Sequence, residues 1–236
     1  MKLETALLFD VETTGTDPAK DRVLEVGVGL FSIPDATLVR AASFLFHAEE
    51  NPAEFVNGLS PALLARFGTR GEGDWSEVAD WFALGDVIVA HHASFDRSFV
   101  PRRLMEVEEP GPWVCSMDDI EWPRTSPNKS LVGICLAHGL GVGSAHRALE
   151  DVLLLVRLFE RAAELGADLT AMMERALRPK KKYRAFVSYD DRELAKAAGF
   201  AWDGDAKIWH KRIVPEDLAE LALPFEVREI VEAPAR

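Results

Sequence analysis

Two carboxylates, Asp10 and Glu12, stand at the end of an apolar run that begins at Leu7 and stops at a Thr-Thr-Gly turn. If Leu7–Glu12 is a strand, both acids point to the same face, because side-chain direction alternates along a strand. Like charges this close lose hydration and raise each other's pKa, so they persist mainly where a cation lies between them. Paired oxygen ligands without a nearby His or Cys favour Mg²⁺ or Mn²⁺ over Zn²⁺. The alternative is a surface strand end with two solvated acids.

Two later segments carry an acid where the chain enters a helix. Asp96, at the end of residues 91–96, falls in a first helical turn, where the helix dipole favours an acid and capping alone explains it. His146 and Asp151 are five residues apart and can face one pocket only if His146 sits at the frayed start of its helix. A lone His at a helix start is more often structural. Asp151 stands among leucines and a valine, where an unpaired acid is costly.

The three segments together resemble the exonuclease motifs of the DEDDh family. This group has a ribonuclease H-like fold and includes ribonuclease T and the proofreading subunit of bacterial replicative DNA polymerase. Motif order and spacing match over roughly residues 4–165. The matching residues are Asp10, Glu12, Thr13, Thr14 and Gly15, then His91, Ala93, Phe95 and Asp96, then His146, Ala148, Leu149 and Asp151.

The chain departs from the family pattern in two places. The family usually has Asn where this chain has His92, and His-Gly-Ile where it has Asn57-Gly58-Leu59. We therefore expect the local substrate contacts at these two places to differ.

The resemblance implies hydrolysis of phosphodiester bonds with two Mg²⁺ or Mn²⁺ ions about 4 Å apart. Asp10, Glu12 and Asp151 would hold one ion, and Asp10 with Asp96 the other. His146 would be the general base, since an unperturbed pKa of about 6.5 suits proton abstraction near neutral pH.

The activity implied is that of a 3′–5′ exonuclease, which releases nucleoside 5′-monophosphates from single-stranded or frayed nucleic acid, with DNA favoured. By the same resemblance, the side chains that bind the last nucleotide are Thr13, Thr14, Phe95 and His92. For the two threonines the alternative is an ordinary turn after a strand. The implied partner is a nucleic acid with a free 3′ end, with a DNA polymerase or repair protein as a candidate protein partner.

Two other functions stay open. One is an RNA-trimming or oligoribonuclease-like enzyme with the same site, because 2′-hydroxyl discrimination depends on pocket shape. The other is a non-catalytic nucleic-acid-binding protein on the same fold, which the presence of all five site residues disfavours.

The length and composition of the chain fit either one large domain or one medium-sized domain with one small domain. The chain has 236 residues, of which 48% are hydrophobic, and a net charge of −12. Residues 1–177 hold 15 Lys and Arg against 28 Asp and Glu, whereas residues 178–236 hold 12 against 11. This asymmetry predicts a boundary near Arg178, and the acidic body argues against nonspecific tracking along duplex DNA.

Cys115 and Cys135 lack metal-ligand spacing and are expected to be thiols in a reducing compartment, with a disulfide as the minority view. We see no signal peptide and no membrane-spanning segment, so we expect a cytoplasmic protein without a membrane partner.

Strands followed by alternating strands and helices predict an α/β fold with a mixed sheet flanked by helices. Gly27 and Gly29 lie in one expected strand and allow a neighbour to approach one face closely. The expected strands are Leu7–Glu12, Arg22–Phe31, Leu38–Phe46, Asp86–Ala90 and Trp113–Cys115. The expected helices are Pro61–Phe67, a helix capped by Asp74 that includes Val78, Ser94–Val107, Lys129–His138 and Ala145–Leu165.

Residues 1–177 would thus form the exonuclease domain, residues 178–183 a basic linker, and residues 184–236 a small α+β accessory domain. We expect a strand over Arg184–Ser188, a helix over Asp191–Ala198 and a hairpin over Phe200–Ile213. The hairpin resembles a short Gly-x-x-Trp-Asp and Lys-x-Trp module that is attached to nucleic-acid-processing proteins. Its Trp202 and Trp209 either form the core of this domain or stack bases. In the second case the phosphate partners would be Lys207, Lys211 and Arg212.

Overall fold

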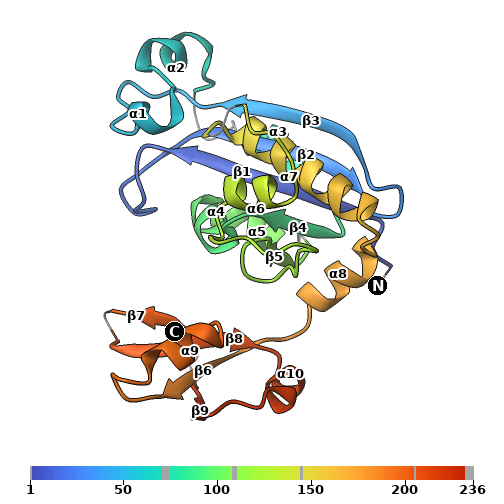
Figure 1. The fold of residues 1–236 in the computed structure, drawn as a ribbon. Coiled ribbons are helices and arrows are strands. Elements are labelled where there is room, and N and C mark those ends of the chain that lie inside the picture. Colours follow the sequence, from blue (N-terminus) through green and yellow to red (C-terminus); the bar gives the residue numbers. More distant parts are fainter. Residues whose placement is uncertain (1, 71–74, 108–110, 144–145, 205, 232–236) are drawn as a thin grey trace. The chain divides into compact units, whose positions relative to one another are not determined.

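The computed structural model describes residues 2–70, 75–107, 111–143, 146–204 and 206–231. The chain divides into two compact units, residues 1–177 and 178–236 (Figure 1). Asp74, the expected helix cap, and Ala145, the expected first residue of a later helix, lie outside the described residues.

A five-stranded mixed sheet organises the first unit, in the order β3-β2-β1-β4-β5. Strands β1 (Thr5–Thr13), β2 (Val23–Ser32) and β3 (Thr37–Leu45) form an antiparallel meander. Strand β4 (Val87–Ala90) runs parallel to β1, and β5 (Trp113–Cys115) runs parallel to β4. The predicted mixed sheet is therefore confirmed.

Helices cover both faces of this sheet (Figure 1). On one face, α6, α7 and α8 pack on apolar strand residues such as Leu8 and Val89. On the other face, α3, α4 and α5 pack on residues such as Leu7 and Phe9. The helices of this unit are α1 (Glu54–Asn57), α2 (Pro61–Phe67), α3 (Ser76–Phe82), α4 (Ala93–Phe99), α5 (Arg102–Val107), α6 (Leu131–Ala137), α7 (Ala148–Glu164) and α8 (Leu169–Ala176).

The helix predicted over Ser94–Val107 is wrong in one respect, because the chain forms two helices there. Val100 is extended, with φ −72° and ψ 128°, and ends α4. Pro101 follows it, and proline disfavours the helical conformation of the residue before it. The short helices α1 and α8 lie where the sequence predicts no helix.

Gly27 and Gly29 of β2 let α7 approach the sheet, as predicted. A Cβ atom at Gly27 would lie 2.4 Å from the carbonyl oxygen of Ala148, and one at Gly29 would lie 2.8 Å from Cγ1 of Val152. Gly27 is also the strand partner of Asp10. The first turn of α7 therefore lies against the sheet beside Asp10.

The second unit is a small α+β domain, as predicted, with a four-stranded antiparallel sheet in the order β7-β8-β6-β9. Its elements are β6 (Lys181–Phe186), α9 (Arg192–Ala197), β7 (Ala201–Asp203), β8 (Ile208–Ile213), α10 (Pro215–Glu220) and β9 (Glu226–Glu229). The linker predicted over residues 178–183 is too long. Strand β6 begins at Lys181, because Tyr183 and Ala185 alternate inward and the backbone pairs with β8.

No helix within the described residues is both long enough and apolar enough to cross a membrane. Cys115 and Cys135 are both free thiols.

Candidate active site

Asp10 and Glu12 share one face of β1, and that face carries α7. Leu8, on the same face, packs in the core beside α7, whereas Leu7 packs on the opposite side. Asp151 lies in the first turn of α7. One carboxylate oxygen each from Asp10, Glu12 and Asp151 lies within 4.8 Å of the other two. The strand alternation and the close approach of α7 thus bring together acids that are far apart in the sequence.

Asp96 joins this cluster from the helix that follows β4. It is buried, with 2% of its surface exposed, and its Oδ1 accepts a hydrogen bond of 3.2 Å from the backbone N–H of Val11. Because β4 is parallel to β1, the start of α4 lies at the same edge of the sheet as the end of β1. The charge of Asp96 raises the pKa of Asp10, which places the two carboxyl groups in one electrostatic cluster.

Burial, together with repulsion from neighbouring carboxylates, raises the pKa of all four acids. Burial, then the charges of Asp96 and Asp151, hold the pKa of Asp10 well above its usual range. Burial, then Asp151, raises the pKa of Glu12 to about 8, and burial raises the pKa of Asp96 to about 7. Burial is also the main cause of the raised pKa of Asp151. The cluster therefore resists carrying its full negative charge without a cation.

The donor atoms of the cluster fit a hard divalent cation. Oδ1 of Asp151 is buried and finds no hydrogen-bond partner in the described parts of the chain. An acceptor in that position costs free energy unless something positive binds it. All four groups offer carboxylate oxygens, the ligands that Mg²⁺ and Mn²⁺ prefer. The residues present can thus hold such an ion.

His146 lies two residues before the start of α7, ahead of the cap residue Arg147. It is exposed and has a left-handed backbone, with φ 66°. The backbone amide and the ring of His146 both lower the pKa of the Asp151 carboxyl group, which places His146 near that carboxyl group. His146 thus lies off the helical path, ahead of the first turn of α7 that carries Asp151.

Glu25 is a residue of this site that the sequence motifs miss. It is 1% exposed and is the strand partner of Glu12 on β2. The guanidinium group of Arg147 donates two hydrogen bonds to it, and the backbone N–H of Ala148 donates a third. A lone acid inside the apolar run Val23–Phe31 was the available signal, since such an acid needs a partner.

His92 and Phe95 form a stacked pair at the start of α4. Their ring centroids are 6.0 Å apart and their planes differ by 11°. His92 is exposed, whereas His91 bonds Ser116 and the carbonyl oxygen of Lys129 through its two ring nitrogens. Of the two histidines, His92 is therefore the one that presents its ring outward beside Asp96.

Thr13 and Thr14 build the turn after β1. The hydroxyl of the buried Thr13 donates to the carbonyl oxygen of Gly15. The hydroxyl of Thr14 donates to Asp21 and accepts from the backbone N–H of Arg22. Both hydroxyls are engaged within the turn, so contacts to another molecule would come mainly from its backbone.

Asn57 stands where the family usually has a histidine, and its side chain stabilises the turn at Thr13. It is 2% exposed, and its side-chain nitrogen donates to the carbonyl oxygen of Thr13. Its side-chain oxygen accepts from Asn51 and from the backbone N–H of Leu59. Gly58 supplies the left-handed turn, with φ 67°, that follows it.

A family model described as "Exonuclease" matches residues 7–159, which is more than half of the chain and contains all four acids and His146. The chain belongs to the exonuclease family. The recognition of the DEDDh type from its motifs is thereby confirmed. A second family model, "Domain of unknown function (DUF8626)", matches residues 181–230 of the small unit.

Two curated relatives of this exonuclease-family chain are bacterial DNA polymerase III components. The PolC-type DNA polymerase III of Bacillus subtilis (strain 168) is 29% identical over 185 residues, which cover 69% of this chain and 12% of the relative. The DNA polymerase III subunit epsilon of Treponema pallidum (strain Nichols) is 27% identical over 161 residues, covering 64% of this chain and 73% of the relative. The chain thus spans about an eighth of the PolC-type relatives that it matches.

Solved structures show the same fold. A complex of E. coli ExoI with single-stranded DNA superimposes with a TM-score of 0.61 at 18% identity, covering 81% of this chain and 50% of that one. Exonuclease X in complex with 5′-overhanging duplex DNA gives a TM-score of 0.53 at 22% identity, covering 72% of this chain and 99% of that one. The predicted ribonuclease H-like fold is confirmed.

Proposed function

We propose that this protein is a metal-dependent 3′–5′ exonuclease that removes nucleoside 5′-monophosphates one at a time from single-stranded or frayed nucleic acid. The observation that carries the proposal is the convergence of Asp10, Glu12 and Asp151, with Asp96 beside them, in a chain of the exonuclease family. Fold kinship alone would not support this activity, since one fold hosts many functions.

The four acids would hold two Mg²⁺ or Mn²⁺ ions. When bound, the ions supply charge compensation for the scissile phosphate and lower the pKa of water. The charges of Asp96, Asp151 and Glu12 all raise the pKa of Asp10, which fits a ligand shared by both ions. Asp96 reaches the end of β1 from α4, where it accepts a hydrogen bond from the backbone N–H of Val11. Oδ1 of Asp151 has no hydrogen-bond partner among the described residues, so it would be available to bind a metal ion.

His146 would accept the proton of the attacking water. Its exposure lets the imidazole pass that proton on to solvent, and its influence on the pKa of Asp151 fits a position next to the acids. Positioned acid–base groups of this kind contribute roughly 10²–10⁴-fold to rate.

Recognition of the last nucleotide would fall to the turn at Thr13 and Thr14 and to the ring pair of His92 and Phe95. The turn offers backbone groups because its hydroxyls are engaged internally. The rings offer flat faces for a base or sugar. A site closed around a free 3′ end would exclude internal phosphodiester bonds.

DNA is the favoured polymer, and a DNA polymerase or repair protein is the candidate partner. Support comes from the names of the relatives, which are DNA polymerase III components, and from structural neighbours described as complexes with single-stranded DNA. An RNA-trimming enzyme with the same acids is the second candidate, because the acids and His146 act on the phosphate and not on the 2′ position.

The test uses matched single-stranded DNA and RNA, each labelled at the 5′ end, with Mg²⁺ or with EDTA. We expect Mg²⁺-dependent shortening from the 3′ end and release of nucleoside 5′-monophosphates, faster for DNA. A covalently closed single-stranded circle is the matched control and should stay intact. Cleavage of the circle, release of 3′-monophosphates, or failure to digest either linear strand would refute the proposal. The last result would favour the non-catalytic alternative.

A further inference from the structure

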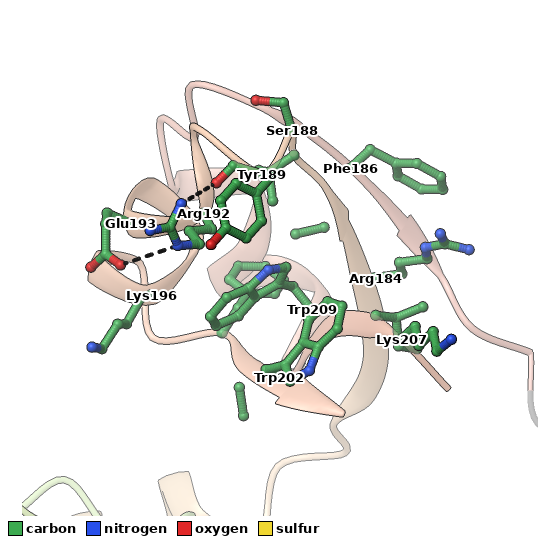
Figure 2. A pocket seen from close by; sticks show the side chains of 15 residues that line it. Arg184, Phe186, Ser188, Tyr189, Arg192, Glu193, Lys196, Trp202, Lys207 and Trp209 are labelled. Atoms are coloured by element: carbon green, nitrogen blue, oxygen red, sulfur yellow. Dashed lines mark hydrogen bonds and ion pairs between the residues drawn. The ribbon is translucent and has the colours of Figure 1, made fainter. Parts of the chain in front are cut away.

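The second unit carries a hollow whose lining combines aromatic and cationic side chains (Figure 2). Its volume is about 920 Å³, at the upper end of the range for small-molecule sites. It lies over β6, α9, β7 and β8, and no residue of the acid cluster lines it. The labelled residues of Figure 2 are Arg184, Phe186, Ser188, Tyr189, Arg192, Glu193, Lys196, Trp202, Lys207 and Trp209.

The two tryptophans of the hollow have different environments. Trp209 packs against the small core around Ala185 and Phe200, which agrees with the core alternative for that residue. Trp202 is 52% exposed and lies outside that core. The two rings contact each other with centroids 5.6 Å apart and planes inclined by 57°. Trp202 thus adds exposed aromatic surface to a hollow that also exposes Tyr189 and Phe186, and a joint apolar patch of this kind marks a binding site.

The ring geometry restricts how a flat ligand can bind. A base held between two parallel rings needs a gap of about 7 Å, twice the ~3.5 Å contact distance between carbon atoms. The Trp202–Trp209 pair is already closed and tilted, so a base would lie on the outer face of Trp202. Tyr189, which is 78% exposed and carries Arg192 over its ring at 4.0 Å, offers a second flat surface.

Charge in the hollow favours an anion. Among the residues that the structure describes, four cations line it, namely Arg184, Arg192, Lys196 and Lys207, against a single acid, Glu193. The ion pair between Arg192 and Glu193 is long, at 3.8 Å, and exposed, so it neutralises little. Flat apolar rings beside several cations match a chain of bases joined by phosphates better than they match an acidic or apolar peptide.

The uneven charge of the chain supports the same occupant. Residues 1–177 hold 15 basic against 28 acidic residues, whereas residues 178–236 are balanced at 12 against 11. The net negative charge of the first unit repels a polyanion from any part of that unit where no metal ion compensates the charge. A protein that must retain a nucleic acid strand needs cationic surface, and in the second unit that surface surrounds exposed rings.

We propose that this hollow is a binding site for unpaired nucleotides of a single strand, with a base stacked on Trp202 and phosphates held by Lys196 and Lys207. Its role would be to retain the strand that the first unit digests. That role rests on the proposed exonuclease function, but the binding itself does not.

The test measures fluorescence anisotropy of a short labelled oligothymidylate with the full chain in EDTA, where hydrolysis is off. Stacking of one base on an aromatic ring is worth about 1–3 kcal/mol, so Trp202→Ala should weaken binding about 5- to 150-fold. Trp202→Phe should recover part of this loss. The double variant Lys196→Ala/Lys207→Ala should reduce the slope of log affinity against log salt by about 1.4.

Lys181→Ala is the matched control, because it removes one exposed positive charge from the same small domain outside the hollow. It should change affinity less than either test variant. Circular dichroism checks that each variant is folded. If Trp202→Ala does not fold, the double Lys variant decides alone.

Equal binding by wild type, Trp202→Ala and the double Lys variant would overturn the proposal. So would competition by polyglutamate as strong as competition by unlabelled oligothymidylate, since that would show only a charged patch. A failure of the proposed exonuclease function is measured separately. In that case the strand stays intact in Mg²⁺, but Trp202→Ala still weakens binding in EDTA.

Discussion

The guanidinium group of Arg147 closes on the buried carboxylate of Glu25 with hydrogen bonds of 2.8 Å from Nε and 3.2 Å from a terminal nitrogen. Ser43 donates to the same carboxylate at 2.6 Å, and the first N–H of α7 donates at 3.2 Å. This contact ties the residue after His146 to β2. It therefore holds the start of α7, and with it Asp151, against the sheet.

Arg147→Ala should destabilise the protein by about 2–3 kcal/mol, less than the ~3–5 kcal/mol for a fully buried pair because Arg147 is partly exposed. The reason is the unpaired charge that remains on Glu25. Urea denaturation measures the change. Adding Glu25→Gln should restore part of the lost stability, because glutamine fills the same space without charge. If the double variant is less stable than Arg147→Ala, the buried charge is not the cause.

Asp10→Ala should abolish nuclease activity while leaving thermal stability in EDTA unchanged or raised. The substitution removes a carboxylate that its neighbours repel. Activity on a single strand and a thermal melt are measured on the same preparation. Asp80→Ala, which removes an exposed acid from α3, is the control and should stay active. An Asp10→Ala protein that keeps its specific activity would exclude a role in binding the metal.

His146→Asn should lower the rate by roughly 10²–10⁴-fold without abolishing metal binding. Asparagine tolerates the left-handed backbone at this position better than most residues, so the loss would report the imidazole and not strain. Stabilisation by Mg²⁺ in a thermal melt shows that the acids still bind. An unchanged rate would reject His146 as the base.

Mg²⁺ should raise the melting temperature more at pH 8 than at pH 6. Burial raises the pKa of Glu12 to about 8 and of Asp96 to about 7, whereas both are about 4 in an unfolded chain. The folded protein thus retains protons that the unfolded chain has released. Without metal, its stability falls as pH rises from about 4 towards 8.

Mg²⁺ competes with those protons, so it binds better at the higher pH. Melting curves with Mg²⁺ and with EDTA at both pH values measure the difference, and Asp10→Ala should show a smaller one. An equal gain at pH 6 and pH 8 would show that the acids do not exchange protons for metal.

Gly27→Ala should destabilise the first unit by about 1–3 kcal/mol or more and lower its activity. The new Cβ would meet the backbone of Ala148, which cannot move without shifting Asp151. Gly141→Ala is the control, because a Cβ there meets nothing within 4 Å. Urea denaturation and activity are measured for both variants. A Gly27→Ala protein as stable and active as Gly141→Ala would show that α7 does not need this close approach.

Much of the site could be predicted from the sequence because its signals are local. The period of two along β1 puts Asp10 and Glu12 on one face, and the glycines of β2 predict a close neighbour. The break between α4 and α5 is also a local signal, carried by Pro101. The chain segments that hold Asp96, His146 and Asp151 could be recognised only as motifs, since nothing local brings them to β1.

Only the tertiary structure decided what depends on contacts between distant residues. Glu25 and Arg147 are 122 positions apart, so their pairing needs the docking of α7 on β2. The difference between Trp209, packed on the core, and Trp202, open to solvent, depends on which ring face the small sheet covers. Spacing along the chain sets the direction of a side chain, but burial and partners are set by the elements that pack around it.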